Sequence, residues 1–265
     1  MPGNSWRVDA PLAVAVFLFF NASPSRGQGG PPYYTTDPGT PGPNSWEINF
    51  GYMPFLYNGS SISHIPDADI NYGIGERIQL TLETAWLRGT SGAAPGNYGP
   101  NQDQWGIKWR FYDNDQTNLG ISIFPQFSIN TPFVRSSQHG LTPAGPSLLL
   151  PMEFAKKLGP VDVNWEVGFN NVWKGPNGWI AGLVVGHDLT KNWEIDAEIF
   201  NSGTYGHGGY QNTFDMGARY KIRPPFILLL MAGRSVTSAS ATQSYFVGYF
   251  GMQFLFPVKP FDTDH

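Results

Sequence analysis

The segment that decides the fold reads Trp193-Glu194-Ile195-Asp196-Ala197-Glu198-Ile199, in which apolar and polar side chains alternate at every position. Residues 161–169 follow the same rule, and so do residues 46–52, 78–86 and 104–111. Successive side chains of a β-strand point to opposite faces of a sheet, so a period of two indicates strands with one apolar and one polar face. The sequence therefore predicts an all-β fold.

The lengths and spacing of these segments predict a membrane barrel. Most are about 9–12 residues long, which suits a strand that crosses a membrane better than the shorter strands of soluble proteins. Short connections such as 159–160 alternate with long ones such as 89–103 and 131–146. This asymmetry is typical of outer-membrane barrels. We expect a transmembrane antiparallel up-and-down β-barrel of about 12 strands, at residues 46–55, 63–73, 78–88, 104–112, 118–130, 147–158, 161–170, 178–189, 193–202, 211–222, 226–236 and 244–256.

The composition agrees with a barrel and excludes other classes. Only 14% of the 265 residues are charged and 15% are aromatic, while 32 glycines and 23 prolines make up about a fifth of the chain, far above the average share. A helical enzyme would contain more charges and fewer helix breakers. The net charge of −4 argues against a nucleic-acid partner. A soluble β-sandwich is the alternative, but it would have to bury the aromatic faces against a second sheet.

Both ends of the chain carry export features. Arg7 precedes the apolar run 10–20, which is too short for a transmembrane helix, so we expect a signal peptide at 1–28. A Pro/Gly-rich N-terminal lead-in at 29–45 should be extended and weakly ordered. The barrel would then occupy 46–256, with a short periplasmic tail at 257–265.

The last expected strand resembles the assembly signal that outer-membrane barrels place there. It has an aromatic residue, then glycine, then alternating apolar residues, although it lies before the end of the chain and not at it. We assign that role to Phe250, Gly251, Phe254 and Phe256.

Several further segments together resemble a known family. They are residues 34–43 followed by Trp46, residues 66–74 with Arg77, the turn 159–160, residues 188–200 and residues 232–234. In order, they are similar to bacterial outer-membrane barrels of the meta-pathway phenol-degradation transporter family. The resemblance implies a β-barrel in the outer membrane of a Gram-negative-type bacterium, with passage of small solutes, aromatic or hydrophobic ones among them. It implies no catalytic residue.

The polar faces of the expected strands would line the lumen. Their charged residues are mostly acidic, which favours passage of cations or neutral polar solutes. The same groups could instead pair with one another and close the interior, with Lys108 and Arg110 near Glu83. The expected lumen-lining residues are Glu47, Asp69, Glu83, Lys108, Arg110, Asp162, Glu166, Glu194, Asp196, Glu198, Asp215, Arg219 and Lys221.

The apolar faces would contact lipid. Tryptophan anchors at a membrane surface because its ring is apolar while its N–H seeks water. The expected membrane-interface aromatics are Trp46, Trp86, Trp105, Trp109, Trp165 and Trp193. Residues 148–150, 183–185 and 226–231 are apolar on both faces, so their inward sets stay open. They could form a hydrophobic stretch of lumen for aromatic solutes, or contact the N-terminal segment folded inside.

No motif for catalysis is present. The histidines have no metal-ligand spacing, and the nearest nucleophile pair, Ser137 with His139, lies in a loop. We therefore expect no enzyme, no cofactor and no metal. The expected partners are outer-membrane lipid, the barrel-assembly machinery and a small solute. The alternatives to a channel are a non-conducting structural barrel, a barrel that binds a partner through its long loops, and, more remotely, a lipid-modifying enzyme.

Overall fold

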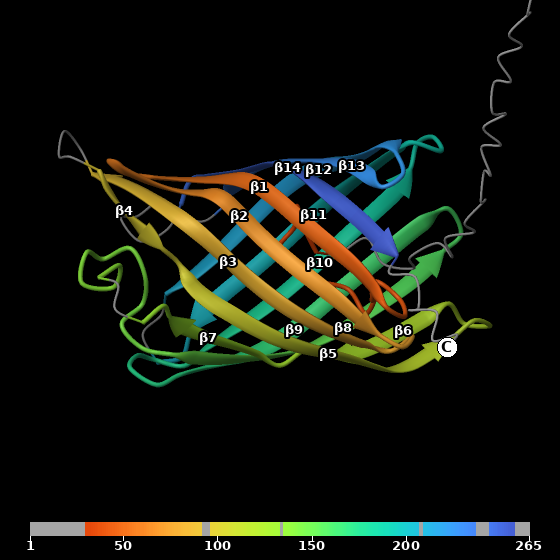
Figure 1. Cartoon of the computed structure of the whole chain (residues 1–265), viewed down its shortest axis with the longest axis horizontal. Helices are drawn as coiled ribbons and strands as arrows, with labels where there is room; N and C mark the ends of the chain where they lie inside the picture. Colours follow the sequence, from red (N-terminus) through yellow and green to blue (C-terminus); the bar gives the residue numbers. More distant parts are fainter. Residues whose placement is uncertain (1–29, 92–95, 133–134, 207–208, 237–243, 258–265) are drawn as a thin grey trace, which may run out of the picture.

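The computed structural model describes residues 30–91, 96–132, 135–206, 209–236 and 244–257. Strands form one antiparallel sheet that curves round on itself (Figure 1). The strands are β1 (Ser45–Tyr57), β2 (Ser60–Ile74), β3 (Ile78–Ser91), β4 (Asn97–Pro100), β5 (Gln102–Asn114), β6 (Leu119–Ile123), β7 (Gln126–Asn130), β8 (Ser147–Leu158), β9 (Val161–Val172), β10 (Gly178–Asp188), β11 (Trp193–Thr204), β12 (Tyr210–Arg223), β13 (Phe226–Ser235) and β14 (Phe246–Pro257).

Two of the barrel strands are interrupted. Strands β4 and β5 follow each other and both pair with β3. Strands β6 and β7 both pair with β5 and with β8, and they are separated by Phe124 and Pro125. Proline has no N–H to donate to a neighbouring strand, which explains why the expected continuous strand 118–130 is broken there. With each interrupted strand counted once, the barrel has twelve strands.

The first and last strands close the barrel. Strand β1 pairs antiparallel with β14 from Ser45 opposite Pro257 to Leu56 opposite Phe246. A closed sheet has no free edge, and every backbone group in the wall can find a partner within the sheet. The prediction of an antiparallel barrel of about 12 strands is confirmed. The loop predicted at 89–103 is shorter than expected, because β3 extends to Ser91 and β4 begins at Asn97.

The two faces of the wall differ sharply. Large apolar side chains such as Trp105, Ile107 and Val167 are exposed on the outside, whereas polar side chains such as Asn49, Glu153 and Glu198 are fully buried inside. This is the reverse of a soluble protein and is typical of barrels in lipid. Within the described residues, no helix is both long and apolar enough to cross a membrane.

Candidate functional site

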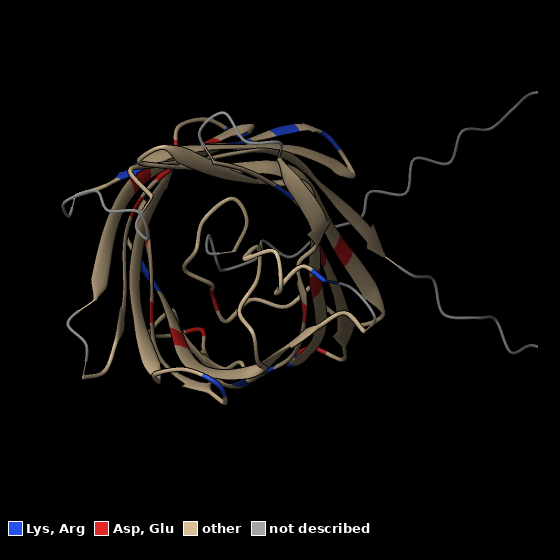
Figure 2. Ribbon diagram, turned by 90° about the vertical axis from the view of Figure 1, so that its left-hand side faces the viewer, with Lys and Arg blue, Asp and Glu red and all other residues tan. Residues whose placement is uncertain are grey.

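The N-terminal segment 30–44, which we call the plug, lies inside the barrel (Figure 2). Its hydrogen bonds reach β2, β5, β8, β9, β11 and β12 of the wall. Thr35 at its centre is fully buried. The expectation of a weakly ordered lead-in is therefore wrong for these residues. The barrel interior supplies hydrogen-bond partners that the Pro/Gly-rich composition alone does not indicate.

Two neighbouring carboxylates of β11 hold the middle of the plug. Glu198 accepts the backbone N–H of Tyr34 at 3.1 Å and that of Thr35 at 2.6 Å. The hydroxyl of Tyr33 donates to Asp196 at 2.9 Å. Burial raises the pKa of the Tyr33 hydroxyl, and the charge of Asp196 adds to this effect, so the phenol remains a donor. Hydrogen bonds to charged acceptors are about twice as strong as neutral ones, so these contacts fix the plug backbone.

A second anchor joins β5, β8 and β9. The hydroxyl of Thr36 lies between the carboxylates of Glu153 and Glu166, 3.1 Å from the latter. Lys108 forms an ion pair with Glu153 at 3.3 Å and donates to the backbone carbonyl of Asp37. The lysine charge thus neutralises a buried acid and binds the plug at the same time, which offsets the cost of burying both.

A third anchor lies at the start of the plug. Arg219 of β12 donates to the carbonyls of Gly30 and Pro31, each at 3.1 Å, and forms an ion pair with Glu194 of β11 at 3.2 Å. Its guanidinium also lies 5.5 Å from the centre of the Tyr33 ring. The fork of donors on arginine suits such multiple contacts, whereas lysine would present a single point charge.

Glycines in the wall make room for the plug. A Cβ at Gly182 of β10 would overlap the hydroxyl of Thr35, and one at Gly217 of β12 would overlap the hydroxyl of Tyr33. At Gly120 of β6 a Cβ would instead meet Pro38 at 3.5 Å, an ordinary contact distance. The plug therefore fits closely against β10 and β12 and more loosely against β6.

Part of the inner wall is apolar and touches the plug. Val184, Leu229, Met231, Val247 and Tyr249 point inward from β10, β13 and β14 and form one buried cluster with Tyr33. The sequence leaves open which residues of 183–185 and 226–231 point inward, because both faces of these segments are apolar. Val184, Leu229 and Met231 of these segments point inward and pack with Tyr33 of the N-terminal segment, as the second of the two interpretations expects.

The expected lumen-lining residues are distributed around this inner wall. Nine are buried, Glu47, Glu83 and Arg110 are half-buried, and Lys221 is exposed near one rim. The expected pairing of Glu83 with Lys108 or Arg110 is wrong, because Lys108 pairs with Glu153 and Arg110 lies 3.7 Å from Asp113. That these residues line a conducting path stays a prediction. The nine buried residues are Asp69, Lys108, Asp162, Glu166, Glu194, Asp196, Glu198, Asp215 and Arg219.

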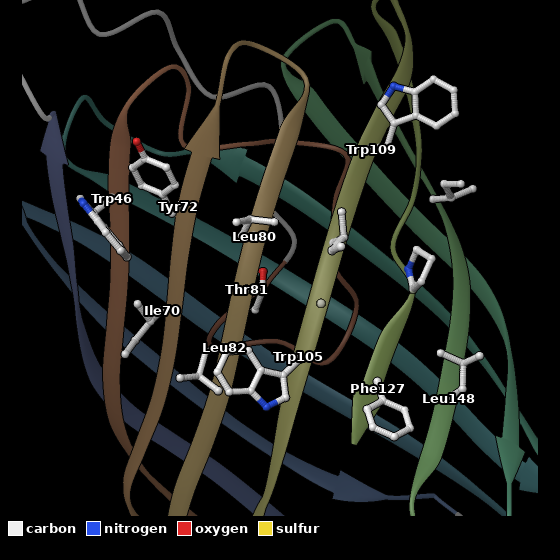
Figure 3. A pocket seen from close by; sticks show the side chains of 14 residues that line it. Trp46, Ile70, Tyr72, Leu80, Thr81, Leu82, Trp105, Trp109, Phe127 and Leu148 are labelled. Carbon is white, nitrogen blue, oxygen red and sulfur yellow. The ribbon is translucent and has the colours of Figure 1, made fainter. Parts of the chain in front are cut away.

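The expected interface aromatics lie on the outer face. Five of the six tryptophans are exposed, while Trp165 is half-buried and stacks on Phe154 with ring centres 5.1 Å apart. An apolar groove of about 900 Å³ runs over the outside of β1, β2, β3 and β5 towards β8, and Figure 3 shows Trp46, Trp105 and Trp109 along it. Pro125, at the break between β6 and β7, also lines it. The height of these residues in a membrane stays a prediction.

The expected assembly-signal residues all lie on β14, at the seam that closes the barrel. Phe250 is exposed, and the ring of Phe254 lies 5.5 Å from that of Phe226 and 6.2 Å from that of Phe256. Their role in assembly stays a prediction. The expected signal peptide at 1–28 lies outside the described residues, as does the expected tail beyond Pro257.

The described residues contain no group of three or more His, Cys, Asp or Glu that could hold a metal ion. Ser137 and His139 lie in the loop between β7 and β8, where His139 donates its backbone N–H to Arg135 at 3.0 Å. No hydrogen bond joins the side chains of Ser137 and His139 in the part of the chain that the structure describes. This loop shows no assembled nucleophile and base.

Comparison with known proteins shows which solved structures share this fold. No protein-family model matches the chain, and no curated protein matches it. Among solved structures it is similar to the COG4313 outer membrane channel from Pseudomonas putida F1, with a TM-score of 0.64 and 12% identity over 86% of this chain and 100% of that one. The KdgM porin has a TM-score of 0.53 and 11% identity, covering 78% of this chain and 98% of that one. The NanC porin has a TM-score of 0.53 and 6% identity, covering 81% and 100%.

These similarities concern architecture. The fold is that of outer-membrane β-barrel proteins, and the three solved structures are named as a channel or a porin. At identities this low, the residues of the plug and its anchors must be interpreted from their own geometry.

Proposed function

We propose that the protein is a channel for small solutes in the outer membrane of a Gram-negative-type bacterium, and that its plug controls passage. The observation that carries the proposal is the set of hydrogen bonds from the plug to buried charged side chains such as Glu198, Glu166 and Arg219. A segment that only filled space would need no more than the apolar packing that Tyr33 makes. The plug is held in addition by charged groups, whose interactions respond to solutes and ions.

Aromatic or hydrophobic compounds are the solute class that we favour. The support is the inward apolar cluster of Val184, Leu229, Met231 and Val247, which the plug covers through Tyr33. A shifted plug would expose this surface to the lumen. The resemblance to the phenol-degradation transporter family points the same way and stays a prediction, together with the expected contacts to membrane lipid and the assembly machinery.

A non-conducting barrel is the second candidate. It is favoured by two ion pairs on the inner wall. Lys108 with Glu153 bridges β5 and β8, which flank the strand formed by β6 and β7, and Arg219 with Glu194 joins the neighbouring strands β12 and β11. The two candidates differ in whether the plug can leave its anchors while the wall stays folded.

A reversible disulfide between plug and wall distinguishes them. The chain contains no cysteine, so the double variant Thr35→Cys with Gly182→Cys would carry the only thiols. A Cβ at Gly182 lies 3.0 Å from the Cβ of Thr35, and a disulfide with its preferred Cβ separation of about 3.5–4.5 Å needs only a small shift. We expect the oxidised protein to pass little ionic current in a planar bilayer, and reduction to raise the current several-fold.

The single variants Thr35→Cys and Gly182→Cys serve as controls, because neither can form the bond within one chain. Their currents should not respond to the reductant. Equal currents through the oxidised and the reduced double variant, with the disulfide verified by mass, would contradict control by the plug. Absence of current in both states would favour the non-conducting barrel.

A further inference from the structure

One part of the inner wall carries acids without a cation. Asp69 of β2 lies directly opposite Glu83 of β3, and Asp67 lies two residues before Asp69 on the same inward face. Like charges placed directly across two strands repel one another. Within the described residues, Glu83 has no hydrogen bond and no ion pair, and Asp69 receives only side-chain amide donors, from Asn49 at 3.0 Å and Asn71 at 2.9 Å. We call Asp67, Asp69 and Glu83 the acidic wall.

The buried lysine and arginine of the inner wall bind other groups. Lys108 binds Glu153 and the plug, and Arg219 binds Glu194 and the plug. Of the described histidines, His64 contacts the acidic wall, through Asp67 at 2.7 Å. Glu83 is half-buried, whereas Asp67 and Asp69 are buried. The acidic wall thus holds three carboxyl groups that have no lysine or arginine partner among the described residues.

A separate observation from β14 points to a ligand at the same place. The ring of Tyr249 lies across Gly51 and Gly251, where an added Cβ at either glycine would overlap it, and its hydroxyl reaches over Gly51. Gly51 is the residue of β1 directly opposite Asp67, so the hydroxyl is aimed at the acidic wall. Tyr249 is only 4% exposed, and its hydroxyl has no hydrogen-bond partner among the described residues. A buried hydroxyl without a partner is costly, which makes it a marker for a missing ligand.

We propose that Asp69, Glu83 and Tyr249 form a binding site for an organic ammonium ion. An ammonium group supplies a positive charge and several N–H donors, which match two carboxylates and a phenol oxygen. A metal ion fits less well, because no three acidic or histidine side chains of the described chain converge as ligands.

The surroundings also favour a ligand with an apolar body. Tyr249 belongs to the buried cluster with Val247 and Met231, so an apolar inner surface continues from the acidic wall along β13 and β14. An amine that carries a ring or a short chain would place its charge on Glu83 and its carbon atoms on this cluster. This proposal rests on the channel function proposed above, and it specifies the class of solute that the channel would bind.

Equilibrium binding tests the site apart from conduction. The purified protein in lipid nanodiscs would be titrated by calorimetry at neutral pH with phenethylammonium, and separately with 2-phenylethanol, its neutral counterpart of similar shape. We expect the amine to bind at least about tenfold more tightly than the alcohol, the difference that one charge-assisted hydrogen bond supplies. Equal affinities would overturn the proposal.

Variants locate the site. Glu83→Gln should weaken phenethylammonium binding about tenfold, and Tyr249→Phe should weaken it less, while neither changes the affinity for the alcohol. Asp162→Asn is the matched control, because it removes an inward carboxylate that is held by Lys157 at 2.7 Å and lies on a different strand, β9. Full amine affinity in Glu83→Gln would overturn the proposal. So would an equal loss in Asp162→Asn, which would indicate a diffuse charge effect.

The outcomes separate this proposal from the channel. A barrel that binds the amine but passes no current in either disulfide state contradicts the channel alone. A barrel that conducts on reduction but binds amine and alcohol equally contradicts the ammonium site alone. Tyr249→Phe removes one oxygen atom that has no partner among the described residues, so this variant should remain folded and keeps the test decisive even if Glu83→Gln assembles poorly.

Discussion

Glu198 accepts the backbone N–H groups of both Tyr34 and Thr35, so one carboxylate fixes two consecutive residues of the plug. A glutamine at this position offers one acceptor oxygen and turns an N–H group towards the second donor. We expect Glu198→Gln to shift the docking equilibrium of the plug about tenfold towards release. Single-channel recordings would show this as a larger fraction of time in conducting states. Asp162→Asn should leave that fraction unchanged, and an unchanged record for Glu198→Gln would contradict the role of this carboxylate.

The close approach of Thr35 to Gly182 gives a second prediction. An alanine Cβ there would overlap the Thr35 hydroxyl, while its nearest wall atom, in Phe200, is 3.1 Å away. Gly182→Ala should therefore displace the plug and raise the current several-fold, with the barrel still folded. Gly120→Ala is the matched control, since its Cβ would meet Pro38 at 3.5 Å. Similar currents for the two alanine variants would show that the plug does not respond to crowding at β10.

The wall of the barrel could be predicted from the sequence because the pattern that specifies it is local. Alternation at residues 193–199 assigns each side chain to a face without knowledge of its neighbours. The break at Pro125 was less visible, because the flanking residues of 118–130 still alternate. A proline in an expected strand was nevertheless a usable signal, since it cannot donate to the ladder.

The plug was harder to predict, for a physical reason. Its backbone N–H groups bind Glu198, more than 160 residues away in the chain, and backbone donors leave no mark in a sequence. The available signals were indirect. Val184 and Leu229 are apolar on a face where a water-filled lumen calls for polar groups, and Gly182 is a glycine two residues before Val184 on the same strand. Together such positions indicate that a segment of chain packs against the inside of the wall.

The ion pair between Arg219 and Glu194 gives a third prediction. Arg219→Gln leaves Glu194 buried without its cation, which costs about 3–5 kcal/mol when one partner of a buried pair is removed. The double variant Arg219→Gln with Glu194→Gln should recover most of that loss, because the carboxylate that Arg219 pairs with is then removed too. Guanidinium unfolding of the barrel in vesicles measures all three proteins. A double variant no more stable than Arg219→Gln would show that Arg219 acts mainly through the plug carbonyls of Gly30 and Pro31.

The position of the barrel in the membrane gives the last prediction. Val167 lies near the middle of β9 with its side chain 52% exposed on the outer face, opposite Met152 and Ala181. A charge at the bilayer midplane destabilises a barrel by about 2–4 kcal/mol, whereas near the interface the cost is about 0–1 kcal/mol. We expect Val167→Arg to lose the larger amount in lipid vesicles. Leu158→Arg, at the end of β8 with the side chain 54% exposed, should lose the smaller one. Leu158 and Val167 are both exposed on the outer wall. Equal losses of stability in the two variants would therefore mean that β9 does not cross the hydrocarbon core at Val167.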